Sequence, residues 1–213
     1  MRHLFLALIC GLPLVASATP TTVTSVDLNR YSGKWYEVAA IPQFFQRQCV
    51  ANTTAEYSLA DDGQVRVFNS CDKDNGERTS AEGHAKVVDT ATNSKLKVTF
   101  LKLFCWLYLF GGDYWILDLA PDYSYALVGS PDLQYAWILA RTPSLSLEIL
   151  TQIEQTFKAQ GYDTCQILTS VQDGGFTSRD PLCKIVASPT GGSPNLVTPT
   201  DELDTSPEPP EQQ

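Results

Sequence analysis

The sequence predicts an all-β protein: an eight-stranded antiparallel up-and-down barrel followed by one C-terminal α-helix and a short ninth strand. Three observations predict it. Between Gly33 and Val171 the 213-residue chain consists mostly of short strand-like segments at steady spacing, as in sandwiches and barrels. Asp61-Asp62-Gly63 is a strong hairpin-turn signal between two such segments. A single later segment, from Leu147 on, repeats its apolar residues at helical spacing instead.

The strands are identified by residues that alternate in polarity, which places them on opposite faces of a strand. For example, Leu96 and Val98 alternate with Lys95 and Lys97. Eight strands are expected at about 34–42, 50–60, 64–72, 80–89, 95–101, 113–120, 124–130 and 135–141. Eight strands closed into a barrel leave an interior that can hold one small ligand, and closure removes the unpaired edges that invite aggregation.

The helix is expected after the eighth strand. Ser144 or Ser146 can cap its first turn, because a serine hydroxyl accepts a hydrogen bond from a free backbone N–H group. Gly161 suits the left-handed residue that ends a helix, and the ninth strand follows at about 166–172. The apolar residues at helical spacing are Leu147, Leu150, Ile153 and Phe157.

The first 18 residues have the organisation of an export signal. A basic start precedes a short apolar run, and Ala16-Ser17-Ala18 fits a cleavage site that leaves a mature chain from Thr19. The run is shorter than the roughly 20 apolar residues that span a bilayer. Cys10 raises the alternative of a lipid-modified lipoprotein, but Ile9 stands where a small residue is normal. We therefore expect a cleaved signal peptide at 1–18 and export to the periplasm, to the outer membrane or to the medium.

One domain is expected over 19–186, followed by a tail. From 187 to 213 the chain is rich in Pro, Gly, Ser and acidic residues, and it cannot bury enough apolar surface to offset its ordering entropy. The formal net charge of the chain is −9, and the sequence shows no basic surface of the kind that nucleic-acid binding needs. We therefore expect a disordered acidic tail and no nucleic-acid partner.

Three segments carry a family resemblance. Gly33-Lys34-Trp35-Tyr36-Glu37 opens the first strand, Pro121-Asp122-Tyr123 precedes the seventh, and Trp137-Ile138-Leu139-Ala140-Arg141 ends the eighth. In this order they resemble the three motifs of the lipocalin family, and the chain from Tyr31 to Val171 is most similar to bacterial lipocalins and to apolipoprotein D. The resemblance implies that Arg141 packs across Trp35 and seals the floor of the barrel, a favourable contact between a guanidinium and an indole face.

The resemblance also implies a function. Lipocalins bind hydrophobic small molecules without catalysis, so we expect binding, storage or transport of a fatty acid, a lysophospholipid or a similar lipid. Burial of each CH2 group of an acyl chain is worth about 0.8 kcal/mol, which makes an apolar interior sufficient for useful affinity. No cofactor and no metal site are expected. The chain departs from those bacterial relatives that are lipoproteins in its long acidic tail and in lacking a lipidation motif.

The inward orientation of Trp35 determines which residues line the interior. Trp137 and Leu139 share a strand face with Arg141 by their period-two spacing, which puts Trp137 nearer the mouth. Glu37 has the same parity as Trp35. Its carboxylate therefore either binds a ligand headgroup or has a structural hydrogen-bonding partner.

On the strand at 113–120 both faces are bulky, so the choice between Tyr114 with Ile116 and Trp115 with Leu117 stays open. For Tyr57 and Trp137 the alternative to ligand contact is a purely structural role. The expected ligand-binding residues are Tyr57, Val67, Val98, Phe100, Tyr114, Trp115, Trp137 and Leu139.

The segment 100–110 is unusually apolar for a loop. Tracing the alternating strands from Trp35 at the closed end places this segment at the open mouth, where an exposed apolar patch would mark contact with a membrane or a partner. Indole and phenol rings suit the membrane interface. We expect the loop to dock the mouth on a membrane; the alternatives are a longer strand that covers the cavity and a dimer contact. The expected docking residues are Leu103, Phe104, Trp106, Leu107, Leu109 and Phe110.

Five cysteines remain after cleavage, and an exported chain favours disulfides. Cys49 and Cys71 fall at the mouth ends of neighbouring strands and are expected to pair. Cys165 with Cys183 is then the next candidate pair, and Cys105 is the candidate free thiol. The resemblance to apolipoprotein D implies a competing pair, Cys49 with Cys183.

Two alternatives to a lipid carrier stay open. Some lipocalin-fold proteins are isomerases with a cavity cysteine, a role that Cys71 could fill as a free thiol. The other alternative is a surface or stress-response scaffold that binds no lipid. His84 is the single histidine of the mature chain, so a Ser-His-Asp triad or a multi-histidine metal site has little support. We expect a protein that is not an enzyme.

Overall fold

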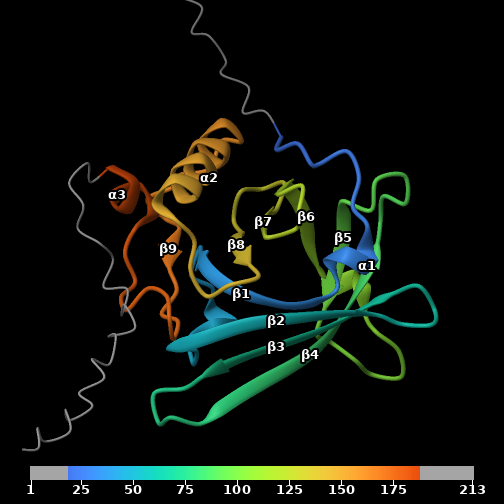
Figure 1. The fold of residues 1–213 in the computed structure, drawn as a ribbon. Helices are drawn as coiled ribbons and strands as arrows, with labels where there is room; N and C mark the ends of the chain where they lie inside the picture. Colours follow the sequence, from blue (N-terminus) through green and yellow to red (C-terminus); the bar gives the residue numbers. More distant parts are fainter. Residues whose placement is uncertain (1–18, 188–213) are drawn as a thin grey trace, which may run out of the picture.

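The computed structural model describes residues 19–187, in which nine strands form one sheet that closes on itself (Figure 1). Helix α1 (Leu28–Tyr31) precedes the barrel, α2 (Leu147–Ala159) follows β8, and α3 (Leu182–Ala187) ends the described chain. Short 3-10 turns η1 (Phe44–Gln46) and η2 (Tyr108–Phe110) lie in the β1–β2 and β5–β6 loops. The strands are β1 (Gly33–Ala40), β2 (Ala51–Leu59), β3 (Val65–Asp72), β4 (Arg78–Val87), β5 (Lys95–Thr99), β6 (Gly112–Leu119), β7 (Tyr125–Gly129), β8 (Ala136–Ala140) and β9 (Leu168–Thr169).

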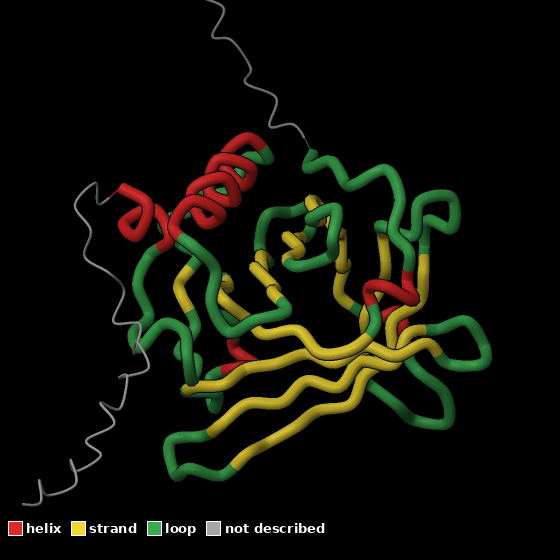
Figure 2. The backbone as a smooth tube through the Cα atoms, viewed as in Figure 1, coloured by secondary structure: helices red, strands yellow, loops and turns green. Residues whose placement is uncertain are grey.

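The barrel closes because β1 pairs with both β8 and β2. Tyr36 lies opposite Ala140 of β8 and opposite Thr54 of β2. Beyond Tyr36 the strands β1 and β2 separate, and β9 pairs with β1 instead. Figure 2 shows the long strands β2, β3 and β4 side by side along one wall. The predicted eight-stranded antiparallel barrel with a ninth strand is confirmed.

The element boundaries differ from the predicted ones mainly near the ends of the domain. Strand β9 has two residues, shorter than the expected 166–172, and the sequence predicted neither α1 nor α3. Helices of four and six residues are too short to show a helical period. Ala187, which the sequence assigned to the tail, is the last residue of α3. The expected signal peptide at 1–18 and the rest of the expected tail, 188–213, lie outside the described residues.

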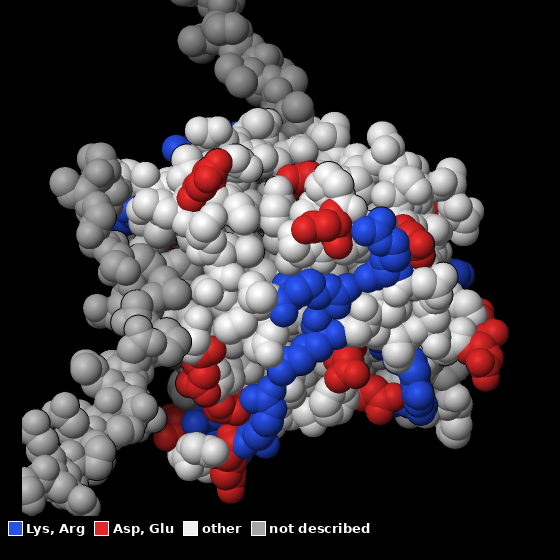
Figure 3. Space-filling view, in the orientation of Figure 1, with Lys and Arg blue, Asp and Glu red and all other residues white. Residues whose placement is uncertain are grey.

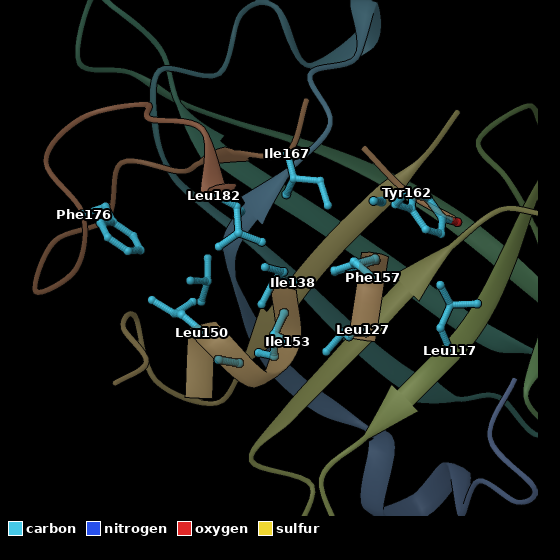
Figure 4. Close-up of a cluster of buried hydrophobic side chains, with 14 residues drawn as sticks. Leu117, Leu127, Ile138, Leu150, Ile153, Phe157, Tyr162, Ile167, Phe176 and Leu182 are labelled. Atoms are coloured by element: carbon cyan, nitrogen blue, oxygen red, sulfur yellow. The ribbon is translucent and has the colours of Figure 1, made fainter. Parts of the chain in front are cut away.

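Helix α2 packs its apolar stripe against the outer wall of the barrel. Ser146 caps the first turn by accepting a hydrogen bond from the backbone N–H of Ile149 at 3.3 Å, and Gly161 follows the helix with a φ of 91°. The stripe packs against outward side chains of β7 and β8 and against Leu182 of α3 (Figure 4). This core fixes the outer faces of these strands and leaves their inward faces to line the barrel interior.

Charged side chains of both signs occur on the face shown in Figure 3. Basic side chains form a narrow diagonal band there, and acidic side chains lie on either side of it. This face therefore carries no broad basic surface for a polyanion.

Candidate ligand-binding site

Arg141 and Trp35 close one end of the barrel. The guanidinium carbon of Arg141 lies 3.8 Å from the ring centroid of Trp35, which is fully buried. Arg141 also donates to backbone carbonyls of the segment that enters β1, at 2.7 Å to Arg30, 3.0 Å to Ser32 and 2.8 Å to Lys34. Because a guanidinium is planar and carries several donors, it stacks and donates at once. The stacking predicted for the floor is present, and it ties the end of β8 to the start of β1.

The barrel interior is lined by alternate residues of its strands. Val65 and Val67 of β3 point inward with Ala85 of β4, while the residues between them face outward. Phe100 lies just beyond β5, where its ring packs beside Gly83 and is partly exposed. Most of the predicted ligand-binding residues belong to the interior cluster: Tyr57, Val67, Val98, Tyr114, Trp137 and Leu139.

The structure decides which face of β6 points inward. Tyr114 and Ile116 belong to the interior cluster, whereas Leu117 belongs to the outer cluster and Trp115 packs against it. The ammonium group of Lys95 lies 4.3 Å from the Trp115 ring centroid. The prediction that Trp115 lines the cavity was therefore wrong. The outer wall beneath α2 also requires bulky apolar side chains, so β6 shows no alternation that could have revealed its inward face.

Three tyrosine hydroxyls meet inside the barrel. The Tyr114 hydroxyl is hydrogen-bonded to that of Tyr31 at 2.8 Å and to that of Tyr57 at 3.0 Å. Burial raises the pKa of Tyr57 to about 12 and raises the pKa values of Tyr31 and Tyr114 as well. All three are therefore neutral at physiological pH and present hydroxyls rather than charges to the interior. Sequence reasoning missed Tyr31, which lies on α1 outside the strand pattern.

A small cavity of about 20 Å³ lies beside this tyrosine cluster. Its other walls are almost entirely apolar and include Leu96, Val98 and Ile116. A space of this size has room for about one water molecule. The inner part of the barrel is therefore narrow in this conformation.

A second cavity, of about 210 Å³, lies at the mouth end of β1 beneath the β1–β2 loop. Glu37 lies in its wall and is 8% exposed. Its Oε1 accepts a hydrogen bond from Ser170 Oγ at 2.6 Å, and its Oε2 accepts one from Gln46 Nε2 at 2.9 Å. Burial raises the pKa of the Glu37 carboxyl group. The sequence left two roles open for Glu37, binding of a ligand headgroup and a structural hydrogen bond. The structure shows the structural hydrogen bonds.

Comparison with known proteins places this fold and site in a family. A family model described as a lipocalin-like domain matches residues 26–172. The chain is a lipocalin. It is 36% identical over 173 residues to the outer membrane lipoprotein Blc of Vibrio cholerae, an alignment that covers 79% of this lipocalin and 97% of its relative.

Two further relatives come from eukaryotes. This lipocalin is 37% identical over 147 residues to temperature-induced lipocalin-1 of Arabidopsis thaliana, with 68% and 78% of the two chains covered. It is 33% identical over 163 residues to apolipoprotein D of Rattus norvegicus, with 72% and 81% covered. Membership of the family implies binding or transport of a small hydrophobic ligand and is consistent with a protein that is not an enzyme.

Solved structures agree on the fold. Insecticyanin from the tobacco hornworm Manduca sexta superposes with a TM-score of 0.56 at 23% identity, covering 78% of this lipocalin and 94% of insecticyanin. The major allergen Per a 4 from cockroaches gives a TM-score of 0.55 at 14% identity, covering 74% and 96%. At these low sequence identities, the structural similarity shows that the barrel fold is shared and shows nothing more.

The β5–β6 loop of this lipocalin, residues 100–111, folds back against the outer wall. The ring of Trp106 stacks on His84, an outward residue of β4, with ring centroids 4.3 Å apart. The Tyr108 hydroxyl donates to Gln64 beside the β2–β3 turn, which lies at the closed end. The prediction that this loop stands at the mouth was therefore wrong, because contacts with the wall of β3 and β4 redirect it.

The same loop exposes several of the predicted docking residues. Phe104 is 98% exposed and Leu109 is 87% exposed, and Leu103 and Phe110 are also well exposed. Trp106 and Leu107 are only partly exposed because they lie against the wall. Within residues 19–187, no helix is long and apolar enough to cross a membrane.

Two disulfides are present in the described chain of this lipocalin. Cys49 pairs with Cys71, and Cys165 pairs with Cys183. Among the cysteines of residues 19–187, Cys105 is free and exposed. The competing pair of Cys49 with Cys183 is not formed. Cys71 is oxidised and has no thiolate to offer, which removes the residue on which the isomerase alternative depended.

Proposed function

We propose that this lipocalin binds and carries a hydrophobic small molecule, such as a fatty acid or a lysophospholipid, with the apolar part of the ligand inside the barrel. The observation that supports this most is the cluster of apolar side chains inside the barrel of a chain that belongs to the lipocalin family. Each buried CH2 group contributes about 0.8 kcal/mol, so an acyl chain gains affinity in proportion to its length.

Ligand entry through the mouth fits the distribution of free space. The mouth cavity of about 210 Å³ is smaller than the roughly 300–1,000 Å³ of typical small-molecule sites. Binding of a long acyl chain therefore requires side chains deeper in the barrel to move. Trp137, which belongs to the interior and stacks on Tyr135, is well placed to report such movement by its fluorescence.

The test is a titration of delipidated protein with a long-chain fatty acid and a lysophospholipid, followed by calorimetry and Trp fluorescence. Val98 lines the small cavity, so Val98→Phe is expected to fill the interior and to weaken binding at least tenfold. Lys97→Leu, on the outward face of the same strand, is the matched control and is expected to bind normally. Absence of binding to the wild-type protein at micromolar concentrations would contradict the proposal and favour a scaffold that carries no lipid.

We also propose peripheral membrane contact through the β5–β6 loop, because Phe104 and Phe110 expose large apolar surfaces on one segment. The double replacement of Phe104 and Phe110 by serine is expected to reduce co-sedimentation with liposomes, whereas Phe44→Ser, which removes an exposed ring from the β1–β2 loop, is not. Loss of self-association in sedimentation velocity without a change in liposome binding would identify the loop as a dimer contact instead.

Export is the third part of the proposal. It is supported by the signal-like sequence at 1–18, by the two disulfides and by the relatives named as outer membrane lipoproteins. The mass of the protein purified from its host tests this point. A mature chain that begins at Thr19 is expected, and an intact Met1 would contradict export through a cleaved signal.

A further inference from the structure

The mouth cavity carries more polar side chains than the small cavity deeper in the barrel. Two arginines line it: Arg47 from the β1–β2 loop and Arg179 from the segment before α3. Gln43 and Gln46 add side-chain amides from the same loop. In a chain whose formal net charge is −9, these two exposed guanidinium groups form a local basic site at one cavity.

Within residues 19–187 neither arginine forms an ion pair with a carboxylate, and the only acidic residue near them in the cavity wall is Glu37, whose pKa burial raises and the charge of Arg179 lowers. The Arg47 side chain has no hydrogen-bond or ion-pair partner within residues 19–187. Arg179 donates to the backbone carbonyl of Cys49 at 2.5 Å, and its remaining donors have no partner there. Two other surface arginines differ: Arg66 pairs with Glu82, and Arg78 pairs with Asp72.

Glu37 is the one acidic residue in the cavity wall, and its oxygen atoms are already occupied by Ser170 and Gln46. Because Gln46 lies one residue before Arg47, the bond from Gln46 to Glu37 holds the loop that carries Arg47. Arg179 is held through Cys49, which the disulfide to Cys71 fixes to β3. Both guanidinium groups therefore sit on segments that are anchored at the mouth.

We infer that the mouth cavity binds the anionic head of an amphiphilic ligand, a carboxylate or a phosphate, through Arg47 and Arg179. This inference rests on the proposed function, since it places the apolar tail in the barrel interior and the head at the mouth. Strand geometry links the two regions, because Glu37 of the cavity wall lies opposite Leu139, a residue of the interior cluster. Guanidinium groups match both kinds of head, because they donate paired hydrogen bonds to carboxylate and phosphate oxygens.

The experiment compares ligands that differ only in the head. A long-chain fatty acid, its methyl ester and a lysophosphatidic acid of the same chain length are titrated into delipidated full-length protein. Arg47→Gln and Arg179→Gln are each expected to weaken binding of the two anions about three- to tenfold, the effect of a charge-assisted hydrogen bond that is partly exposed to solvent. The double variant is expected to lose more than tenfold, and the methyl ester is expected to bind all variants within twofold.

Arg66→Gln, which removes the same charge from the outer face of β3, is the matched control and is expected to leave all affinities unchanged. Unchanged binding of the methyl ester shows that the variants are folded. Loss for the fatty acid alone or for the lysophosphatidic acid alone identifies which head the site prefers.

Two outcomes separate the inference from the proposed function. If the wild-type protein binds the acid and the ester and the arginine variants bind both as before, the headgroup site is wrong and the carrier function stands. If the wild-type protein binds none of the three ligands, the carrier function itself fails.

Discussion

Tyr114 is the central member of the tyrosine cluster, and its replacement by phenylalanine tests the energetics of the barrel interior. Tyr114→Phe removes one oxygen and both inter-tyrosine hydrogen bonds, so the buried hydroxyls of Tyr31 and Tyr57 lose their partner. An unsatisfied buried hydroxyl costs about 1–3 kcal/mol. A water molecule that enters the adjacent cavity of about 20 Å³ can replace part of the loss. We therefore expect a destabilisation near the lower end, about 2–4 kcal/mol for the two groups.

Two further variants test whether the three hydroxyls stabilise the protein as a hydrogen-bonded cluster. Tyr31→Phe breaks only one of the two bonds and leaves Tyr114 paired with Tyr57, so we expect a cost of about 1 kcal/mol. The triple variant with phenylalanine at all three positions leaves no hydroxyl without a partner. Replacing both partners of a buried bond by apolar groups of the same shape is nearly neutral, so the triple variant is expected to be more stable than Tyr114→Phe.

Urea unfolding with the disulfides intact measures these differences, and equal m-values would show that the unfolded states are comparable. A hydrogen-bonded tyrosine cluster is contradicted if Tyr114→Phe costs no more than Tyr31→Phe, or if the triple variant is the least stable of the three. Either result would mean that the hydroxyls contribute independently and not as a hydrogen-bonded cluster.

The remaining predictions concern the floor, pH dependence and the free thiol. Arg141→Lys is expected to cost about 2 kcal/mol in urea unfolding, because an ammonium cannot stack on Trp35 and donate to three carbonyls at once; a cost below 0.5 kcal/mol would show that charge alone suffices. Burial raises the pKa of Tyr57 to about 12, against about 10 in an unfolded chain, so its stabilising contribution is complete below pH 10 and is lost as the pH rises toward 12. Thermal melts between pH 8 and 11.5 should fall less steeply for Tyr57→Phe than for the wild type, and parallel curves would contradict this. A thiol reagent is expected to label one thiol per molecule of native protein, at Cys105, and no thiol in the Cys105→Ser variant. The other four cysteines of residues 19–187 are paired in disulfides.

Much of the fold and part of the site could be predicted from the sequence, because strand alternation carries the information. Once Trp35 faces inward, the period of two determines that Trp137, Leu139 and Tyr57 do as well, and all three belong to the interior cluster. The expected Cys49–Cys71 disulfide followed from the same geometry, since it needed only the order and direction of two neighbouring strands.

What the sequence did not predict depends on contacts between distant segments. The stacking of Trp106 on His84 joins a loop to a strand two elements earlier, and no local pattern specifies it. Trp115 was predicted on the wrong face of β6. Both faces of this strand are covered, so polar and apolar residues do not alternate along it. The arginines of the mouth cavity, Arg47 and Arg179, lie in irregular segments, where periodicity gives no information.

The guanidinium of Arg141 also has a consequence for how the chain folds. It bonds the carbonyl of Arg30 across a separation of 111 residues, and β1 joins β8 over a similar interval. Ring closure of the sheet must therefore wait until almost the whole barrel sequence is present, and the loop-closure entropy of such distant pairings slows folding. Until then β1 is an open strand edge, the kind of template on which nascent β-proteins aggregate. The last pairing to form is thus expected to set the folding rate, and a chain that stops before β8 would leave that edge permanently open.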